Sequence, residues 1–565
     1  MDPLRRPASL DPCEIGFTPR PQVSWLSPGL LLGTGIRTTL AMIFGAYLDK
    51  RELQGALPSR TYRQPGENGE LWLDYLADTG DGFDSTYTVA YLLGQPSLTV
   101  DGHELPRGQV LIMGGDLVYP SASMEQYEDR LKGPFTAALP MPPPTGAQPT
   151  LYALPANHDW YDGLTAFLRL FVGERIDHIG GWRTEQSRSY FAVELPHNWW
   201  LFAIDEAFGT YLDDPQLVYF EQVARQLTPQ HRVILATPAP TWSKRDPKAY
   251  DTIDFFVRNV IRPTGADVPI MIAGDQHYYA RYAHPQRQLI TCGGGGAYLT
   301  ATHLLPDRIT VPPPQTHVRK ASPRREYELA ARFPSAPRSR LLSWGIFGRL
   351  PLRNPGFAAL VGVIQTMLML AIAGVATQLT MVEERLVTIP LIVMVLLTLS
   401  GALGLAYIPT GGPKTTRHLI AGTLHGLAQL GLGLIGALVW LQTPFIDLAW
   451  PLPLLTAIVV YLPVAGVVGS LLVATYLLVA SMFDVNLNEL FAAQGIADHK
   501  SFLRLHIGSD GSLTIYPIGV DRICRRWRAD PDAGRPDAAW IVPATPDDAP
   551  RYRLAEGPVR VAGHG

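Results

Sequence analysis

Four long apolar runs between residues 357 and 483 constrain this chain more than any other feature. A helix needs about 20 apolar residues to cross the hydrocarbon core of a bilayer. Each run reaches that length and is nearly free of charge, and a buried helical core does not explain four such runs in succession. We therefore predict an α-helical transmembrane domain of four helices over 356–484. The runs are 357–380, 386–408, 418–441 and 453–483.

Two features complicate the number of spans. Pro463 lies inside the last and longest run, which leaves open a kinked helix or a fifth, partial crossing. The earlier stretch 29–48 also approaches the length of a span, but an arginine at its middle, Arg37, costs about 2.5–3.5 kcal/mol inside a membrane. We expect the N-terminal segment 1–65 to pack on the following domain or on the membrane surface.

Positive charge beside the apolar runs predicts their orientation. The segment 306–355 carries ten arginine and lysine residues, whereas the loop after the first run offers only Arg385. Such residues stay on the cytoplasmic side of a membrane. We therefore expect a multi-pass integral membrane protein whose N-terminal domain faces the cytoplasm. The segment 306–355 is expected to be a basic juxtamembrane linker in contact with anionic membrane lipids.

The overall composition excludes several classes. The net charge of −3 gives no general attraction to nucleic acid, so no nucleic-acid partner is expected. The three cysteines, Cys13, Cys292 and Cys524, form no paired motif, which argues against a disulfide framework or a structural zinc site. The first residues have no apolar stretch of the kind found in a cleavable signal peptide.

The sequence pattern over residues 66–305 predicts a globular α/β domain. Apolar runs of four to seven residues recur there, each closed by Gly, Asp, Asn or Pro, and helical stretches such as 215–227 lie between several of them. Runs of this kind are typical of strands buried on both faces. In an α/β domain, chemistry is expected at the strand ends.

Polar residues stand at or just beyond the ends of these runs. If the runs are neighbouring strands, the side chains converge on one edge of a sheet. Clustered carboxylates repel one another, so they need cations, and two metal ions can clamp a phosphate. An isolated Asp after a strand is more often a turn or a helix cap, so the prediction depends on their ordered recurrence. The residues are Asp78, Asp116, Asn157, Asp275 and His277.

Four short motifs carry a resemblance to a known family. In order along the chain they are ADTGDG, GGDLVYP, ANHDW and AGDQHYYAR. They resemble the motif series of the calcineurin-like metallophosphoesterases, and are most similar to the forms found in purple acid phosphatases. The resemblance covers roughly residues 70–300. It implies a β-sandwich flanked by helices and a phosphoric ester hydrolase in which a metal-bound hydroxide attacks a phosphoester. Beyond residue 300 the chain is more similar to a membrane-anchored branch of the superfamily.

The resemblance implies two metal ions. Asp78, Tyr119 and His277 would bind the first, and the tyrosine favours iron there; Asp116 would bridge both ions. Asn157 and Asp275 would bind the second. The family has histidine at the positions of Asp275 and Thr237, so the second site is expected to take Mn, Mg or Zn, with Mn or Mg preferred over Zn, and to hold its ion weakly. Asp81 remains an alternative to Asp78 as the first ligand.

The resemblance also implies roles at the substrate. His158 would hydrogen-bond the phosphate and protonate the leaving oxygen, with Asp159 orienting its ring. Tyr279, Arg281 and His303 are weaker candidates for substrate binding. The nearby bilayer suggests a lipid-linked phosphoester, but a nucleotide or a phosphoprotein fits equally, and the oligomeric state is not indicated. An alternative function is a catalytically degenerate domain that binds a phosphorylated ligand and signals through the membrane anchor.

After the last apolar run we predict a cytoplasmic β-hairpin segment over 485–528. Alternating apolar residues on either side of Ser509–Ser512 indicate the hairpin. The composition of residues 529–565, rich in Pro, Asp and Ala, predicts disorder.

Overall fold

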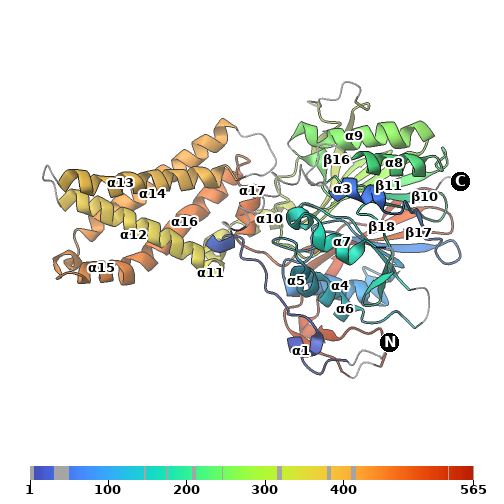
Figure 1. Ribbon diagram of the computed structural model, residues 1–565, viewed down its shortest axis with the longest axis horizontal. Helices are drawn as coiled ribbons and strands as arrows, with labels where there is room; N and C mark the ends of the chain where they lie inside the picture. Colours follow the sequence, from blue (N-terminus) through green and yellow to red (C-terminus); the bar gives the residue numbers. More distant parts are fainter. Residues whose placement is uncertain are drawn as a thin grey trace. The chain divides into compact units, whose positions relative to one another are not determined.

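The computed structural model describes residues 6–30, 33, 50–144, 148–173, 176–206, 212–244, 246–314, 321–377, 383–408, 415–531 and 534–563. These residues form two compact units (Figure 1). Unit 1 takes its described residues from 1–23, 34–336 and 496–565, and unit 2 takes them from 24–33 and 337–495. The predicted surface helix at 29–48 lies almost entirely outside the described residues.

Unit 1 is built on two large mixed sheets. The first has the order β1 (Tyr62–Arg63), β9 (Phe191–Glu194), β10 (Trp199–Ala203), β11 (Arg232–Thr237), β12 (Asp267–Ala273), β14 (Arg287–Cys292), β13 (Tyr279–His284), β16 (Arg325–Phe333) and β15 (Arg308–Val311). The second has the order β21 (Arg551–Leu554), β18 (Leu513–Arg522), β17 (Lys500–Ile507), β2 (Leu71–Leu76), β5 (Val110–Met113), β6 (Thr150–Ala153), β8 (Trp182–Thr184) and β7 (Asp177–Ile179), with β22 (Val559–Val561) also on β18.

The two sheets pack face to face, and helices cover their outer faces. Along β5, Val110 and Ile112 enter the core between the sheets, whereas Leu111 and Met113 pack toward the helices on the other side. Both faces are therefore apolar, as predicted for strands buried on each side. The predicted α/β class is confirmed. Helices α4 (Phe83–Gly94), α6 (Gly133–Ala138) and α7 (Thr165–Phe171) cover the second sheet, and α8 (Asp214–Ala224) and α9 (Asp251–Phe256) cover the first.

Smaller elements complete unit 1. They are α1 (Pro12–Ile15), α3 (Lys50–Leu53), α5 (Met124–Tyr127), β3 (Ser97–Val100), β4 (His103–Pro106), β19 (Trp527–Ala529) and β20 (Ile541–Pro543).

The chain after residue 495 returns to complete the second sheet. Strands β17 and β18 form the predicted hairpin, but β17 also pairs with β2, with Leu505 opposite Leu73. The prediction of disorder after residue 528 is wrong for the described residues, because β21 and β22 pair with β18. Composition concealed a few large apolar side chains there: Trp540 and Ile541 are buried beside α6, and the Trp540 amide donates to the Ala137 carbonyl at 2.8 Å.

Segment 306–355 is not a linker. Its first part forms β15 and β16, which extend the first sheet beyond β13. Along β16, Tyr327 and Phe333 are buried, and the residues between them are more exposed. Charged residues such as Arg325 and Arg332 break the alternation of apolar and polar residues that would have predicted a strand. Its second part forms α10 (Ala336–Ser343) and α11 (Ile346–Arg353).

Unit 2 contains four helices long and apolar enough to cross a membrane among its described residues. They are α12 (Pro355–Thr377), α13 (Glu383–Ala406), α14 (Thr416–Trp440) and the continuous run Leu452–Ser481, followed by α17 (Leu487–Ala492). Between 22% and 39% of each span is buried, so most of its apolar surface faces outward, as a lipid environment requires. The prediction of four such helices is confirmed by their length and composition, and they indicate a membrane protein.

The over-long run is a single helical passage. It consists of α15 (Leu452–Thr456), a π-helical turn (Ala457–Tyr461) and α16 (Leu462–Ser481). Pro463 lies in the first turn of α16, directly after the π turn. A proline inside a continuous helix removes one backbone hydrogen bond, and the wider π turn directly before it lies where that bond would fall. The run therefore gives no fifth helix among the described residues.

Candidate functional site

The predicted polar residues follow strands of both sheets. Asp78 follows β2, Asp116 follows β5 and Asn157 follows β6, and these three strands are parallel neighbours in the second sheet. Asp275 instead follows β12, which belongs to the first sheet. The expectation that all of them meet at one sheet edge is therefore wrong. They meet where the carboxyl ends of strands from two packed sheets lie together, and sequence order does not reveal which strands share a sheet.

Each acidic residue of the cluster has a left-handed backbone. The φ angles are +59° at Asp78, +51° at Asp116 and +65° at Asp275. Asp tolerates this region better than most residues, but each such residue costs about 1–3 kcal/mol. The sharp turn takes the chain out of the strand and brings the carboxylate back toward the strand end. Strain repeated at three strand ends is typical of a functional site.

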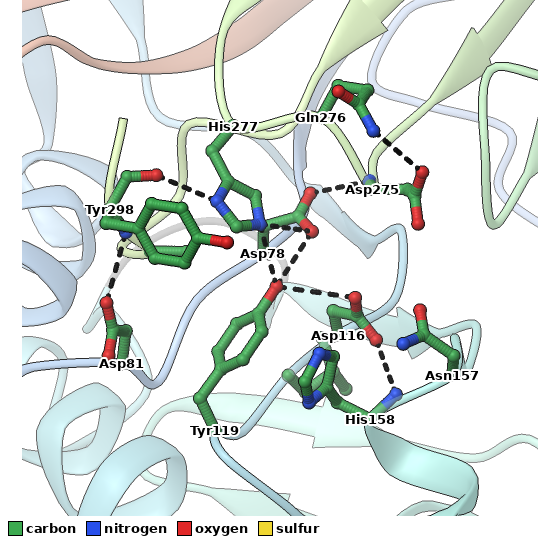
Figure 2. Close-up of polar contacts among 12 residues, drawn as sticks. Asp78, Asp81, Asp116, Tyr119, Asn157, His158, Asp275, Gln276, His277 and Tyr298 are labelled. Atoms are coloured by element: carbon green, nitrogen blue, oxygen red, sulfur yellow. Dashed lines mark hydrogen bonds and ion pairs between the residues drawn. The ribbon is translucent and has the colours of Figure 1, made fainter. Parts of the chain in front are cut away.

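The hydroxyl of Tyr119 is the centre of the cluster (Figure 2). It donates toward Asp78 Oδ1 at 3.0 Å and lies 3.3 Å from Asp116 Oδ2. It also lies 3.1 Å from His277 Nε2, which is 3.6 Å from Asp78 Oδ1. Four residues from three separate segments of the chain thus direct oxygen or nitrogen atoms at one point.

Backbone groups hold this arrangement in place. His277 Nδ1 pairs with the Tyr298 carbonyl at 2.7 Å, which fixes Nε2 toward Tyr119. The second oxygen of Asp78 accepts the Asp275 amide at 2.9 Å. A Cβ atom on Gly274 or Gly293 would lie 2.7 or 2.3 Å from that oxygen, so the chain needs glycine at both positions to approach the carboxylate.

Burial and mutual repulsion dominate the titration of the carboxylates around Tyr119. Burial, followed by the charges of Asp116 and Asp275, raises the pKa of Asp78 well above its usual range. Burial and the charge of Asp275 raise the pKa of Asp116 to about 7. Burial, and next the charge of Lys500, lowers the pKa of His277 to about 3. Buried carboxylates beside a neutral imidazole are the surroundings in which a bound cation is most favourable.

The groups around Tyr119 are oxygen and nitrogen donors of the kinds that can bind a metal ion. Among the described residues, no group of three or more His, Cys, Asp or Glu side chains is arranged to hold an ion. Tyr119 stands among such side chains and is itself an oxygen donor. The Tyr119 hydroxyl lies at hydrogen-bond distances of 3.0, 3.1 and 3.3 Å from donor atoms of Asp78, His277 and Asp116, so four donor groups meet at this point.

The residues predicted for a second ion are occupied differently. The Asn157 amide donates to the Tyr161 hydroxyl at 3.2 Å. Asp275 Oδ2 accepts from Gln276 at 3.1 Å and forms an ion pair with Lys244 at 3.5 Å. Thr237, at the position where the family has histidine, is fully buried, and its hydroxyl donates to the Ala239 carbonyl at 3.1 Å.

His158 and Asp159 do not form the expected imidazole–carboxylate pair. The Asp159 carboxylate accepts from the Leu117 and Ala156 amides and from the Tyr127 hydroxyl. Asp159 is the first residue of a 3-10 turn, and its backbone amide bonds back to the Ala156 carbonyl at 3.1 Å. This turn directs the carboxylate toward backbone amides rather than toward the His158 ring. His158 Nδ1 instead pairs with the Pro120 carbonyl at 2.7 Å. A carbonyl only accepts, so Nδ1 carries the proton, and neutral Nε2 is then an acceptor rather than the expected proton donor.

The remaining candidates lie in other surroundings. Asp81 accepts the Val23 and Tyr298 amides, both at 3.1 Å, whereas Asp78 contacts the cluster. Tyr279 and Arg281 both bind the Glu556 carboxylate, with Arg281 Nε at 2.7 Å, so their polar atoms serve the returning C-terminal segment. His303 is partly buried in the loop that follows β14.

Sequence reasoning missed three contributors to this region. Lys244 lies beyond the end of β11, Tyr298 supplies a carbonyl to His277, and Glu556 comes from the part predicted to be disordered. None belongs to a motif. The one available signal was the position of Lys244 in the sequence. It lies seven residues after Thr237, which stands where the family has histidine.

Comparisons with known proteins add little. No protein-family model matches the chain, and no curated protein matches it. One similar solved structure is described as "GAP50 the anchor in the inner membrane complex of Plasmodium". It is 13% identical, and the similarity covers 41% of this chain and 74% of that chain with a TM-score of 0.31. A score this low does not establish a shared fold.

Proposed function

We propose that unit 1 is a metal-dependent phosphoesterase of the calcineurin-like kind. The observation that carries the proposal is the convergence of Asp78, Asp116 and His277 on the Tyr119 hydroxyl. The order of layers, helix on sheet on sheet on helix, also agrees with what the motif resemblance implies. A metal ion held by these residues supplies the positive charge that polarises a phosphate and makes a water molecule more acidic.

The residues of the chain have separate tasks in this proposal. Asp78, Tyr119 and His277 would hold the ion, for which a phenol oxygen favours iron, and Asp116, from the neighbouring strand, would supply a further carboxylate oxygen. His158 is held beside Asp116 through its ring contact with the Pro120 carbonyl and its backbone amide to Asp116 Oδ1, and is assigned to the substrate phosphate. The left-handed turns keep the carboxylates in place before substrate arrives, so little reorganisation is needed.

The membrane domain suggests where the substrate comes from. We propose that the spans anchor unit 1 at the cytoplasmic face of a membrane, as the arginine and lysine distribution indicates. Substrates at such a face include lipid-linked phosphoesters, which makes them the first class to screen. Nucleotides and phosphoproteins form the second class.

Substitution of Asp116 tests the proposed activity. Asp116→Asn removes the charge shared by the cluster but keeps the size of the side chain, so we expect turnover of p-nitrophenyl phosphate to fall by about 100-fold or more. The full-length protein is purified in detergent after growth with Fe and Mn, and metal content is measured beside turnover. Asp510→Asn, an exposed carboxylate in the β17–β18 turn, is the matched control and is expected to retain activity.

Undiminished activity in Asp116→Asn contradicts the proposal. A second function, binding of a phosphorylated ligand without turnover, is favoured by one observation: threonine and aspartate stand where the family has two histidines. Binding of inorganic phosphate with no hydrolysis of any tested ester, in protein loaded with metal, supports that function instead.

A further inference from the structure

We propose that the ammonium group of Lys244 takes the place of the second metal ion, so that the site works with one ion and one fixed lysine. This inference rests on the proposed function and concerns the same site. It starts from the ion pair between Lys244 Nζ and Asp275 Oδ2, which are 3.5 Å apart. Asp275 is the residue that the resemblance assigns to the second ion.

The topology brings Lys244 to this position. Strands β11 and β12 are parallel neighbours, with Thr237 opposite Ala273 at their carboxyl ends. After β11 the chain forms a short 3-10 turn over Thr241–Ser243 and reaches Lys244, and after β12 it reaches Asp275. Both residues therefore leave the same end of the first sheet. The lysine therefore approaches the cluster from the end of β11, the strand that carries Thr237 where the family has histidine.

The donors available for a second ion are poor. Thr237 stands where the family has an imidazole. It is buried, and its hydroxyl donates a hydrogen bond to the Ala239 carbonyl. Asp275 is already paired with a cation. A metal ion placed on Asp275 would have to displace the ammonium or share the carboxylate with it, and two positive groups at that distance repel.

The exposure of Lys244 suits contact with substrate. Its side chain is 35% exposed, and the Asp275 side chain is 20% exposed, so the pair lies at the open side of the buried cluster. A lysine ammonium carries three donors on a flexible stem and commonly binds phosphate oxygens as a point charge. Lys244 can therefore hold a phosphate oxygen beside Asp78, Tyr119 and His277, the residues that would hold the single ion.

Metal stoichiometry is the first test. Full-length protein purified in detergent, supplied with excess Mn and Fe and then freed of loose metal, is expected to retain one ion per chain with phosphoesterase activity. Two ions per chain with activity overturn the lysine inference and leave the proposed function standing. No bound ion and no activity under any metal overturn the proposed function itself.

Substitution of Lys244 is the second test. Lys244→Met is expected to keep one ion per chain but to lower kcat/KM by about 100-fold and to weaken binding of inorganic phosphate by about 10-fold. Lys244→Arg, which keeps the charge, is expected to recover most of that binding. Lys248→Met, an exposed lysine four positions away, is the matched control and is expected to change neither quantity.

Because Lys244 is partly exposed, Lys244→Met is expected to fold, and retention of one ion per chain checks that it does. Unchanged phosphate binding and unchanged kcat/KM in Lys244→Met overturn the inference.

Discussion

Single atoms decide what the proposed site can hold. The Tyr119 hydroxyl stands within 3.3 Å of an oxygen of Asp78, an oxygen of Asp116 and a nitrogen of His277. Two glycines allow this approach, since any side chain at Gly274 or Gly293 would strike Asp78. At this scale the motifs were informative: they placed these residues at strand ends, although Asp159 turns away from His158 to satisfy backbone amides.

Gly293→Ala tests the packing around Asp78. The new Cβ would lie 2.3 Å from Asp78 Oδ2 and 2.4 Å from the Gln276 carbonyl, so one of them must move. We expect the free energy of unfolding to fall by about 1–3 kcal/mol and bound metal to be lost. Thermal unfolding and elemental analysis measure the two effects. Gly534→Ala, where an added Cβ meets nothing within 4 Å, is the control; equal behaviour of the two variants contradicts the packing.

Strands show most clearly what the sequence could and could not indicate. Runs such as 110–113 are apolar on both faces and were recognised as buried strands. β16 and β21 were missed because charged residues interrupt their apolar positions, and their stability comes from pairing with β13 and β18. Pairing between segments more than 400 residues apart, as in β2 with β17, leaves no local signal in a sequence.

The pair formed by Arg504 and Asp74 tests whether β17 is integral to unit 1. Arg504 Nε lies 2.7 Å from Asp74 Oδ1, and both side chains are almost completely buried. We expect Arg504→Leu to lower the free energy of unfolding by about 3–5 kcal/mol, because it leaves a buried carboxylate without its partner. The double variant Arg504→Leu, Asp74→Leu is expected to recover much of the loss. Denaturant unfolding measures both, and a negligible effect of the single change contradicts the pairing.

The whole molecule joins a layered α/β unit to helices suited to a membrane. The apolar runs predicted the spans directly, since length and hydrophobicity suffice for a helix in lipid. The return of residues 496–565 to unit 1 could not be predicted, because it depends on contacts between the two ends of the chain. If both segments lie on the cytoplasmic side, this return also requires an even number of crossings, as four spans provide.

Labelling of Cys13 tests the proposed side of the membrane. Cys13 is exposed, whereas Cys292 and Cys524 are buried. A membrane-impermeant maleimide is expected to label the native protein in inside-out vesicles and not in sealed right-side-out vesicles. Cys13→Ser, which removes the exposed thiol, is the control. Labelling confined to right-side-out vesicles contradicts a cytoplasmic unit 1.

Elemental analysis of the full-length protein, with phosphoester turnover measured on the same samples, tests whether unit 1 is a metal-dependent phosphoesterase. Wild-type protein is expected to retain a bound Fe or Mn ion and to hydrolyse p-nitrophenyl phosphate, and removal of the ion by a chelator is expected to abolish turnover until metal is restored. Turnover that persists in protein free of metal would contradict the account, as would metal-replete protein that hydrolyses no phosphoester.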